Sequence, residues 1–299
     1  MKLALCISVA VIALAASADA RRRPHHTGAS AGSDAGSDDG AGSGSAKKKH
    51  HRGWPQPAAG PTMSGDPELI FTFDDGPNPK TTPQVLDTLA AHHIHATFFL
   101  VGEMAAGKHA PPIIQRMLRE GHIVANHTMT HKDLCKTKLD DATAAREIDD
   151  GKAAIEQATG GFTTVWFRTP YGVRCERVEN MLADRHLTHF HWDLDPQEWK
   201  HNNAQKAIDY VEREVGKMTG RNVLLMHDIK PATVEALPVI LDWLDAENAR
   251  RKDAHQRRIR IIQSWQLALE RLPPGLADWL ADAAPDPTAL AHALGTAMP

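Results

Sequence analysis

The sequence predicts an α/β fold in which helices surround a parallel sheet. Short runs rich in apolar and β-branched residues alternate with longer segments of helical periodicity between residues 66 and 262. This alternation is typical of βαβ units, whose helices connect parallel strands. Polar residues also follow the ends of several apolar runs, as expected where parallel strands open on one edge of a sheet. The alternation leaves open whether the sheet closes as a barrel or is doubly wound.

The first half of this region alternates strands and helices with clear boundaries. Residues 68–73 form an apolar run that ends in DDGP at residues 74–77, which is a strong turn signal. Thr82 followed by Pro83 is typical of a helix start, and the apolar residues that follow share one helix face. Further strands are predicted at 96–101 and 122–126. Helices are predicted at 111–120 and 139–158, and each is closed by a following glycine.

The second half continues the same alternation. Strands are predicted at 164–168, 188–192 and 222–226, with a last β-branched run at 258–262. Helices are predicted at 176–184, 204–215 and 234–248. Residues 272–299 are rich in Ala and Pro and are expected to form a tail. These patterns indicate a single folded domain at residues 66–271.

The N-terminal residues are expected to lie outside this domain. Lys2, an apolar run and the triplet Ala18-Asp19-Ala20 are typical of a secretory signal peptide at residues 1–20, although a retained N-terminal anchor is the alternative. Residues 21–65 are mostly small, polar or charged, so they cannot bury enough apolar surface to offset the entropy of ordering. We therefore expect an exported protein whose domain follows a disordered linker.

Charge is divided unevenly along the chain. The linker carries seven Lys or Arg and three Asp, a net charge of +4, whereas residues 66–299 carry −7. An acidic domain argues against a nucleic-acid-binding function. The basic linker suits loose contact with an anionic wall polymer or membrane surface, although a merely solvated linker explains it equally well.

Polar residues at the ends of the predicted strands indicate a site. Because the carboxyl ends of parallel strands meet at one edge, we expect these side chains to converge. They are Asp74, Asp75, His127, His131, Arg168, Asp193, Asp195 and His227. His127 and His131 would share one face if the segment between them is helical. Two histidines and one carboxylate leave open positions on a metal, as a catalytic site requires.

Five ordered motifs resemble those of the polysaccharide deacetylase family, the fourth carbohydrate esterase family. They are TFDDGP at 72–77, HTMTH at 127–131, RTPYG at 168–172, DPQEW at 195–199 and LMH at 225–227. The resemblance spans nearly the whole domain. It implies a distorted (β/α) barrel with parallel strands and outer helices, and a metal-dependent hydrolase that acts on acetylated glycans.

The resemblance also implies roles for individual residues. Asp75, His127 and His131 are expected to bind a divalent metal, usually zinc, and Asp74 is expected to be the general base. Arg168 would keep Asp74 ionised, which is physically sensible for a cation beside a base. The backbone N–H of Tyr171 would stabilise the oxyanion, in a turn held open by Pro170 and Gly172.

The last two motifs supply the general acid and the residues around it. By resemblance, His227 is the general acid that protonates the departing amine. Asp195 is expected to orient His227, and Asp193 is a rival for that role. Trp199 and Leu225 are expected to line the pocket for the acetyl methyl group. The family usually has aspartate where Glu198 stands, and we expect this departure to affect substrate fit more than catalysis.

Cysteine usage suggests a disulfide. Cys6 lies in the signal peptide, which leaves Cys135 and Cys175 for an oxidising compartment. Cys135 lies four residues after His131, and Cys175 lies four residues after Tyr171. We therefore expect a disulfide that ties the metal-ligand loop to the oxyanion turn, with a buried reduced pair as the alternative.

The sequence thus predicts a monomeric N-deacetylase of an amino-sugar polymer. Peptidoglycan is the first expectation, because the protein has a bacterial-style export signal, and chitooligosaccharide is the second. One alternative is an O-acetyl esterase acting on a xylan-like glycan with the same metal and base. Another is a wall-binding module that has the site without turnover.

Overall fold

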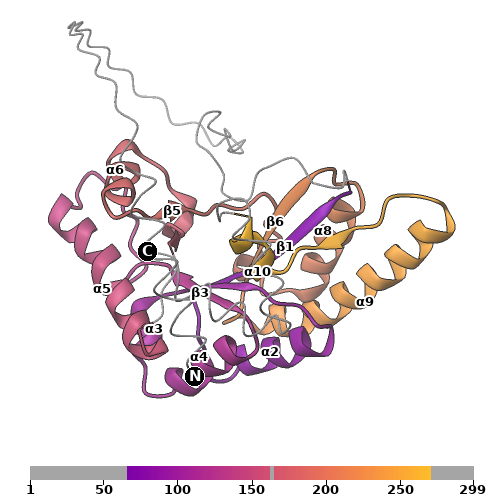
Figure 1. Ribbon diagram of the computed structural model, residues 1–299, viewed down its shortest axis with the longest axis horizontal. Coiled ribbons are helices and arrows are strands. Elements are labelled where there is room, and N and C mark those ends of the chain that lie inside the picture. The colour runs from indigo at the N-terminus through magenta and orange to yellow at the C-terminus, as the bar shows by residue number, and fades with distance from the viewer. Residues whose placement is uncertain (1–65, 162–164, 271–299) are drawn as a thin grey trace, which may run out of the picture.

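The computed structural model describes residues 66–161 and 165–270 (Figure 1). The predicted signal peptide, linker and C-terminal tail lie outside these residues. Among the described helices, none has both the length and the apolar composition that a membrane crossing requires.

The described strands form one curled, open parallel sheet, so the expected α/β fold with a distorted barrel is confirmed. The hydrogen-bonded order is β5-β4-β3-β2-β1-β6, and β7 also pairs with β1. The strands are β1 (Glu68–Asp74), β2 (Thr97–Leu100), β3 (Ile123–Asn126), β4 (Trp166–Phe167), β5 (Thr188–His189), β6 (Arg221–His227) and β7 (Arg260–Ile261). Each of these pairings is parallel.

The segment after β5 brings the two ends of the sheet together. Leu194 forms an isolated parallel bridge with Leu224 of β6. The backbone N–H of Leu225 donates to the carbonyl of Leu194 at 2.9 Å. The chain after β5 therefore pairs with the edge of β6 that faces away from β1. The sheet curls in this way into an open half-barrel.

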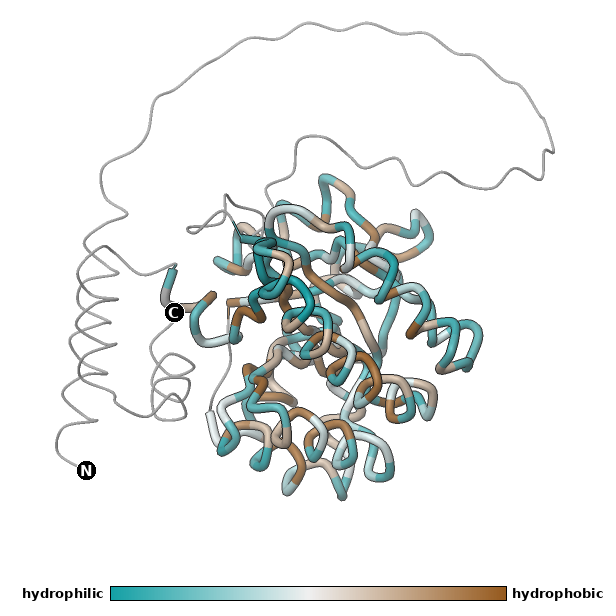
Figure 2. The backbone as a smooth tube through the Cα atoms, turned by 90° about the vertical axis from the view of Figure 1, so that its right-hand side faces the viewer, coloured by the Kyte–Doolittle hydropathy of each residue, from teal (hydrophilic) through white to brown (hydrophobic). Residues whose placement is uncertain are grey.

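The curled sheet is surrounded by helices, which lie outside it except for α10 (Ser264–Leu269), whose Leu267 and Ala268 pack with Ile70 inside the curl (Figure 1). They are α2 (Thr82–Ala91), α3 (Gly102–Ala105), α4 (Ala110–Arg119), α5 (Asp141–Thr159), α6 (Glu176–Asp184), α7 (Glu198–His201), α8 (Ala204–Gly216), α9 (Pro231–Asp253) and α10, with a 3₁₀ turn η2 (Pro170–Gly172). In Figure 2 the hydrophobic stretches gather in the interior, and the outer turns of the helices are largely hydrophilic.

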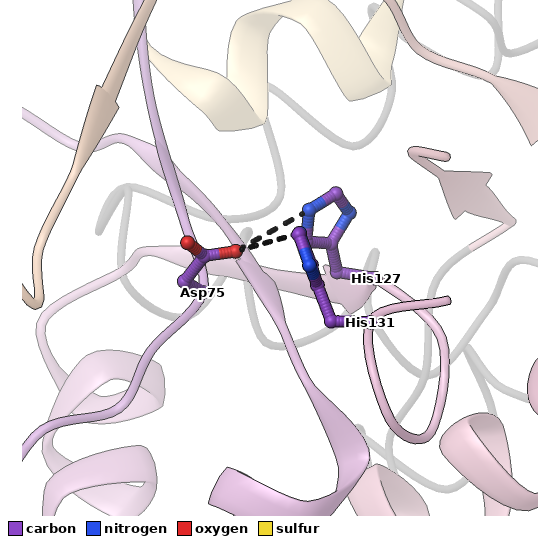
Figure 3. Close-up of side chains that lie close together, drawn as sticks. All are labelled: Asp75, His127 and His131. Carbon is purple, nitrogen blue, oxygen red and sulfur yellow. Dashed lines mark ion pairs between the residues drawn. The ribbon is translucent and has the colours of Figure 1, made fainter. Parts of the chain in front are cut away.

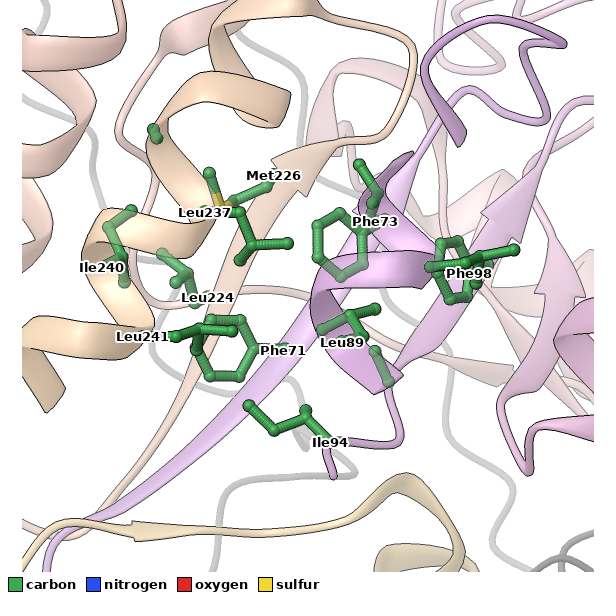
Figure 4. Close-up of a cluster of buried hydrophobic side chains, with 14 of the residues drawn as sticks. Phe71, Phe73, Leu89, Ile94, Phe98, Leu224, Met226, Leu237, Ile240 and Leu241 are labelled. Atoms are coloured by element: carbon green, nitrogen blue, oxygen red, sulfur yellow. The ribbon is translucent and has the colours of Figure 1, made fainter. Parts of the chain in front are cut away.

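Strand β1 is buried along its whole length and separates two apolar clusters. Phe71 and Phe73 pack with residues of α2 and α9 in the larger cluster (Figure 4). Ile70 points to the opposite face, where the smaller cluster lies. Successive side chains of a strand alternate between faces, so Asp74 shares the inner face with Ile70. The period of the strand therefore directs the Asp74 carboxylate into the curl of the sheet.

The predicted elements differ from the observed ones mainly in length. Strands β4 and β5 keep only two residues each, whereas five were predicted at 164–168 and 188–192. Residue 164 lies outside the described residues, and the backbone N–H of Arg168, just after β4, still donates to the carbonyl of Asn126 in β3 at 3.0 Å. Helix α9 is longer than the predicted 234–248 and includes Pro238. The short helices α3, α7 and α10 were not predicted.

Candidate metal and active site

The polar side chains at the strand ends lie at one edge of the sheet. Asp74 is the last residue of β1 and His227 is the last of β6, and these two residues are register partners. His127 directly follows β3, and Arg168 directly follows β4. The parallel sheet thus gathers residues from the N-terminal and C-terminal halves of the domain.

Asp75, His127 and His131 form a group whose ligand atoms all lie within 4.8 Å of one another (Figure 3). Oδ1 of Asp75 lies 3.5 Å from Nε2 of His127 and 3.2 Å from Nε2 of His131. Figure 3 shows both imidazole rings turned towards this carboxylate. The three residues are therefore arranged around one point.

His127 presents its Nε2 as a neutral ligand atom. Its Nδ1 lies 2.7 Å from the carbonyl oxygen of Arg168, so Nδ1 must carry the proton and donate it. Burial lowers the pKa of His127. The imidazole is therefore held neutral, with the lone pair of Nε2 directed at Asp75 and free to bind a cation.

Asp75 is suited to a metal in two respects. Its Oδ1 is buried and accepts no hydrogen bond of standard geometry from the described residues. Burial alone would raise its pKa, but the contact with His131 and the neighbouring imidazoles of His127 and His227 outweigh burial and hold the pKa well below its usual range. An ionised oxygen without a hydrogen-bond donor beside two imidazoles fits a divalent cation, and three protein ligands leave coordination positions open.

The segment between the two histidines is a loop, so the expectation of a shared helical face does not apply. Thr128 and His131 have φ values of 71° and 59°, in the left-handed region that residues other than glycine adopt at a cost of about 1–3 kcal/mol each. The loop places the His131 ring 5.0 Å from the His127 ring, tilted by 62°. Loop geometry, rather than the four-residue spacing, brings the imidazoles together.

Asp74 lies beside the metal-ligand group and is paired with a buried arginine. Nη1 of Arg168 donates to Oδ1 of Asp74 at 2.7 Å and to the hydroxyl of Thr72 at 2.9 Å. Oδ2 of Asp74 lies 3.6 Å from Nε2 of His127. Both Asp74 and Arg168 are almost completely buried. The guanidinium, stacked over Phe99, thus forms a buried ion pair with this carboxylate.

His227 is held by Glu198 on the other side of the site. Oε1 of Glu198 accepts from the backbone N–H of His227 at 2.7 Å and lies 2.9 Å from its Nδ1. Burial would lower the pKa of His227, but Glu198, followed by Asp74 and Asp75, outweighs burial and raises the pKa to about 9. The imidazole is therefore cationic at neutral pH and able to donate a proton from Nε2.

The expectation that Asp195 orients His227 is wrong, because Glu198 makes that contact. Oδ1 of Asp195 instead accepts from the backbone N–H of Gln197 at 3.0 Å and faces Trp199 Nε1 at 3.4 Å. Oδ2 of its rival, Asp193, accepts from the backbone N–H of Val223 at 2.9 Å. Asp195 thus accepts from a donor in its own turn and Asp193 from a donor in β6, whereas Glu198 begins α7 and contacts His227.

The other predicted residues lie around the same edge. Leu225 is buried two residues before His227, on the same strand face. Trp199 is 44% exposed, and its ring lies 6.3 Å from that of His227. Pro170 is buried, and Tyr171 is 66% exposed with its ring 4.8 Å from that of His131. An apolar wall and an exposed aromatic ring thus flank the polar groups.

The structure contains the expected disulfide between Cys135 and Cys175, whose Cα atoms are 5.9 Å apart. It joins the segment after His131 to the segment after Tyr171. Tyr171 has a φ of 61°, in the left-handed region. The covalent link and the contact between the His131 and Tyr171 rings together hold the metal-ligand loop against the η2 turn.

Two residues of the site were missed by sequence reasoning. Glu198 was noted only as a departure from a motif, although a carboxylate beside Trp199 was a signal that it could partner His227. Thr72 shares the inner face of β1 with Asp74 and accepts from Arg168, and the period-2 pattern of the strand was the signal for this.

Comparisons with known proteins agree with this geometry. A sequence model of the polysaccharide deacetylase family matches residues 63–190. A chitooligosaccharide deacetylase of Sinorhizobium fredii is 38% identical over 165 residues, which cover 55% of this chain and 74% of that protein. The match of the family model ends before Glu198 and His227.

Relatives that act on peptidoglycan are similar too. The peptidoglycan-N-acetylmuramic acid deacetylase PdaC of Bacillus subtilis is 38% identical over 177 residues, 59% of this chain and 35% of that protein. A solved structure of PdaC superimposes with a TM-score of 0.57 at 28% identity, and the match covers 75% of this chain and all of that one.

Proposed function

The chain belongs to the polysaccharide deacetylase family, and from this premise we propose that it is exported and removes N-acetyl groups from an amino-sugar polymer, peptidoglycan first and chitooligosaccharide second. It is a hydrolase of carbon–nitrogen bonds. The observation that carries the proposal is the group of Asp75, His127 and His131 beside a buried Asp74, with a cationic His227 opposite. The order of substrates rests on the predicted signal peptide.

The reaction divides among the residues of this chain. A divalent metal held by Asp75, His127 and His131, which we expect to be zinc, would polarise the acetyl carbonyl and lower the pKa of a water to near 7. Asp74 accepts a proton from the water molecule whose oxygen attacks the acetyl carbonyl carbon. Arg168 holds the Asp74 carboxylate in place through the 2.7 Å ion pair.

The remaining steps use the opposite side of the site. The backbone N–H of Tyr171 donates to the oxyanion of the tetrahedral intermediate, and such a donor is worth about 3 kcal/mol in the barrier. His227 then donates its Nε2 proton to the sugar nitrogen, because an amide anion is a very poor leaving group. Glu198 keeps His227 charged until this transfer. Leu225 and Trp199 line the space for the acetyl methyl group.

Acetate release tests this proposal. The purified protein is incubated with peptidoglycan, chitooligosaccharides and acetylxylan, with a chelator and Asp74→Asn as controls. We expect acetate from the two amino-sugar polymers, and loss of release with either control. Release from acetylxylan alone would favour the O-acetyl esterase. Binding of a glycan by the zinc-loaded protein without any release would instead indicate a binding module.

Comparison of amide and ester substrates sharpens the assignment. His227→Ala should reduce amide hydrolysis far more than ester hydrolysis, because an alkoxide leaves more readily than an amine without a proton. Equal losses on both substrates would contradict the role of His227 as the acid.

A further inference from the structure

The loop at 127–131, called here the metal-ligand loop, carries two of the three metal ligands. It has two residues at positive φ and lies outside the helices and strands. Its backbone therefore depends on neighbouring elements for its conformation. The amino end of α3 provides two contacts, since the N–H groups of Gly102 and Glu103 donate to the carbonyls of Thr128 and Met129 at 2.9 Å each.

Helix α5 provides further contacts to this loop, and Glu147 makes most of them. Oε2 of Glu147 accepts from the backbone N–H of Thr130 at 2.8 Å, and Oε1 accepts from the Thr130 hydroxyl at 2.6 Å. Nζ of Lys132 donates to Oε1 at 2.9 Å. The backbone carbonyl of Glu147 accepts from the N–H of Met129 at 2.7 Å. Four donors on or next to the metal-ligand loop thus converge on one residue that is only 4% exposed.

Gly151, one helical turn after Glu147, allows α5 to come this close. A Cβ at Gly151 would lie 2.7 Å from Oδ1 of Asn126 and from the backbone carbon of Thr128, and 2.8 Å from the nitrogen of Met129. Glycine inside a helix costs about 0.5–1 kcal/mol relative to alanine, so its presence calls for a packing reason. Residues four apart share a helix face, so Gly151 and Glu147 face the same loop.

We propose that Glu147 is a positioning residue for the metal site, which sets the metal-ligand loop so that His127 and His131 face Asp75. This inference rests on the metal site of the proposed function and deepens it. Glu147 acts through Thr130, which lies directly before His131. The ion pair with Lys132 does not explain its burial, because Lys132 is half-exposed and such pairs contribute little.

Zinc affinity tests the inference directly. Wild type, Glu147→Ala, Glu147→Gln and Glu156→Ala are titrated with zinc in competition with a chromophoric chelator, and the melting temperature of each metal-free protein is measured in parallel. Glu156 is the matched control, because it lies on the same helix and pairs with Lys152, away from the loop. Residues that orient metal ligands typically contribute 10–100-fold in affinity, so Glu147→Ala should weaken zinc binding by about that factor.

The variants give distinct outcomes. Glu147→Gln keeps the volume and one acceptor oxygen, so we expect its affinity to lie between those of wild type and Glu147→Ala. Glu156→Ala should bind zinc as wild type does, even where its melting temperature falls. Wild-type affinity in Glu147→Ala, or in Glu147→Gln where the alanine variant does not fold, would overturn the inference. Equal weakening in Glu156→Ala would also overturn it.

The proposed function and this inference fail in different ways. A wild-type protein that binds no zinc overturns the proposed metal site, and with it the role of Glu147. If the wild-type protein binds zinc but no more tightly than Glu147→Ala does, only the role of Glu147 is overturned.

Discussion

The carboxylate side and the imidazole side of the metal-ligand group are built differently. Asp74 ends a strand that is buried along its length and paired on both sides. Asp75 follows it with a φ of 75°, and its backbone N–H donates to the carbonyl of Phe99 in β2 at 3.2 Å, so the sheet holds both carboxylates. His127 and His131 sit on a loop whose position depends on side chains of α5, on the start of α3 and on a disulfide. The comparison teaches that one half of the site follows from the sheet, whereas the other half requires a supporting shell.

The largest expected effect distinguishes the general base, Asp74, from the neighbouring metal ligand, Asp75. Asp74→Asn should lower kcat for acetate release by about 10²–10⁴-fold, because the base is lost. Zinc affinity should stay close to wild type, because Asp75 and both histidines remain. Acetate release and zinc titration of the same preparation check this. A fully active Asp74→Asn variant would contradict the assigned base.

Loss of the disulfide should act on the imidazole side only. Replacing Cys135 and Cys175 by serine removes a link that closes a long loop, and such links typically contribute about 2–4 kcal/mol to the free energy of unfolding. Denaturant unfolding of the double variant measures the loss. We expect weaker zinc binding as well, since the loop after His131 is released. Wild-type zinc affinity in the double variant would show that the loop does not need this link.

Two glycines test the two sides separately. The Asp228 carboxylate occupies the place that a Cβ on Gly76 would take, beside the Asp75 turn, and Gly151 faces the metal-ligand loop. Alanine at either position should lower the free energy of unfolding by about 1–3 kcal/mol through overpacking. Gly216→Ala is the control, because its Cβ would meet only Trp243 at 3.9 Å. Thermal unfolding of the three variants measures the difference, and equal melting temperatures would be inconsistent with these contacts.

The smallest expected effect concerns pH. The pKa of His227 is raised to about 9, so the acid is charged below that pH, and activity declines as the pH rises through it. The stabilisation that the charged imidazole contributes is complete below pH 6.5 and is lost as the pH rises towards 9. Glu198→Gln removes the charge that raises this pKa, so kcat at pH 8 should fall roughly tenfold or more, with the decline shifted to lower pH.

Asp195→Asn is the matched variant for this pH profile. Its carboxylate accepts from Gln197 and faces Trp199, so the alkaline decline should stay where it is in wild type. A shift of the alkaline decline to lower pH in Asp195→Asn but not in Glu198→Gln would restore Asp195 as the residue that orients His227.

Much of the sheet and of the site could be predicted because both follow from periodic patterns. Apolar runs ending in polar residues placed Asp74, His127 and His227 at one edge. The sequence did not reveal which carboxylate meets His227, because this depends on Gln197. Its φ of 57° turns the chain so that Glu198, rather than Asp195, points inwards. The conformation of the metal-ligand loop was equally hidden, since Thr128 and His131 adopt backbone angles that their residue types disfavour.

The central claim is that Asp75, His127 and His131 hold one divalent cation. The most direct test is anomalous diffraction at the zinc edge from crystals of the zinc-loaded protein. We predict a single strong anomalous peak within bonding distance of Oδ1 of Asp75 and of Nε2 of both histidines. A peak elsewhere, or imidazoles turned away from Asp75 with no peak between them, would contradict the account.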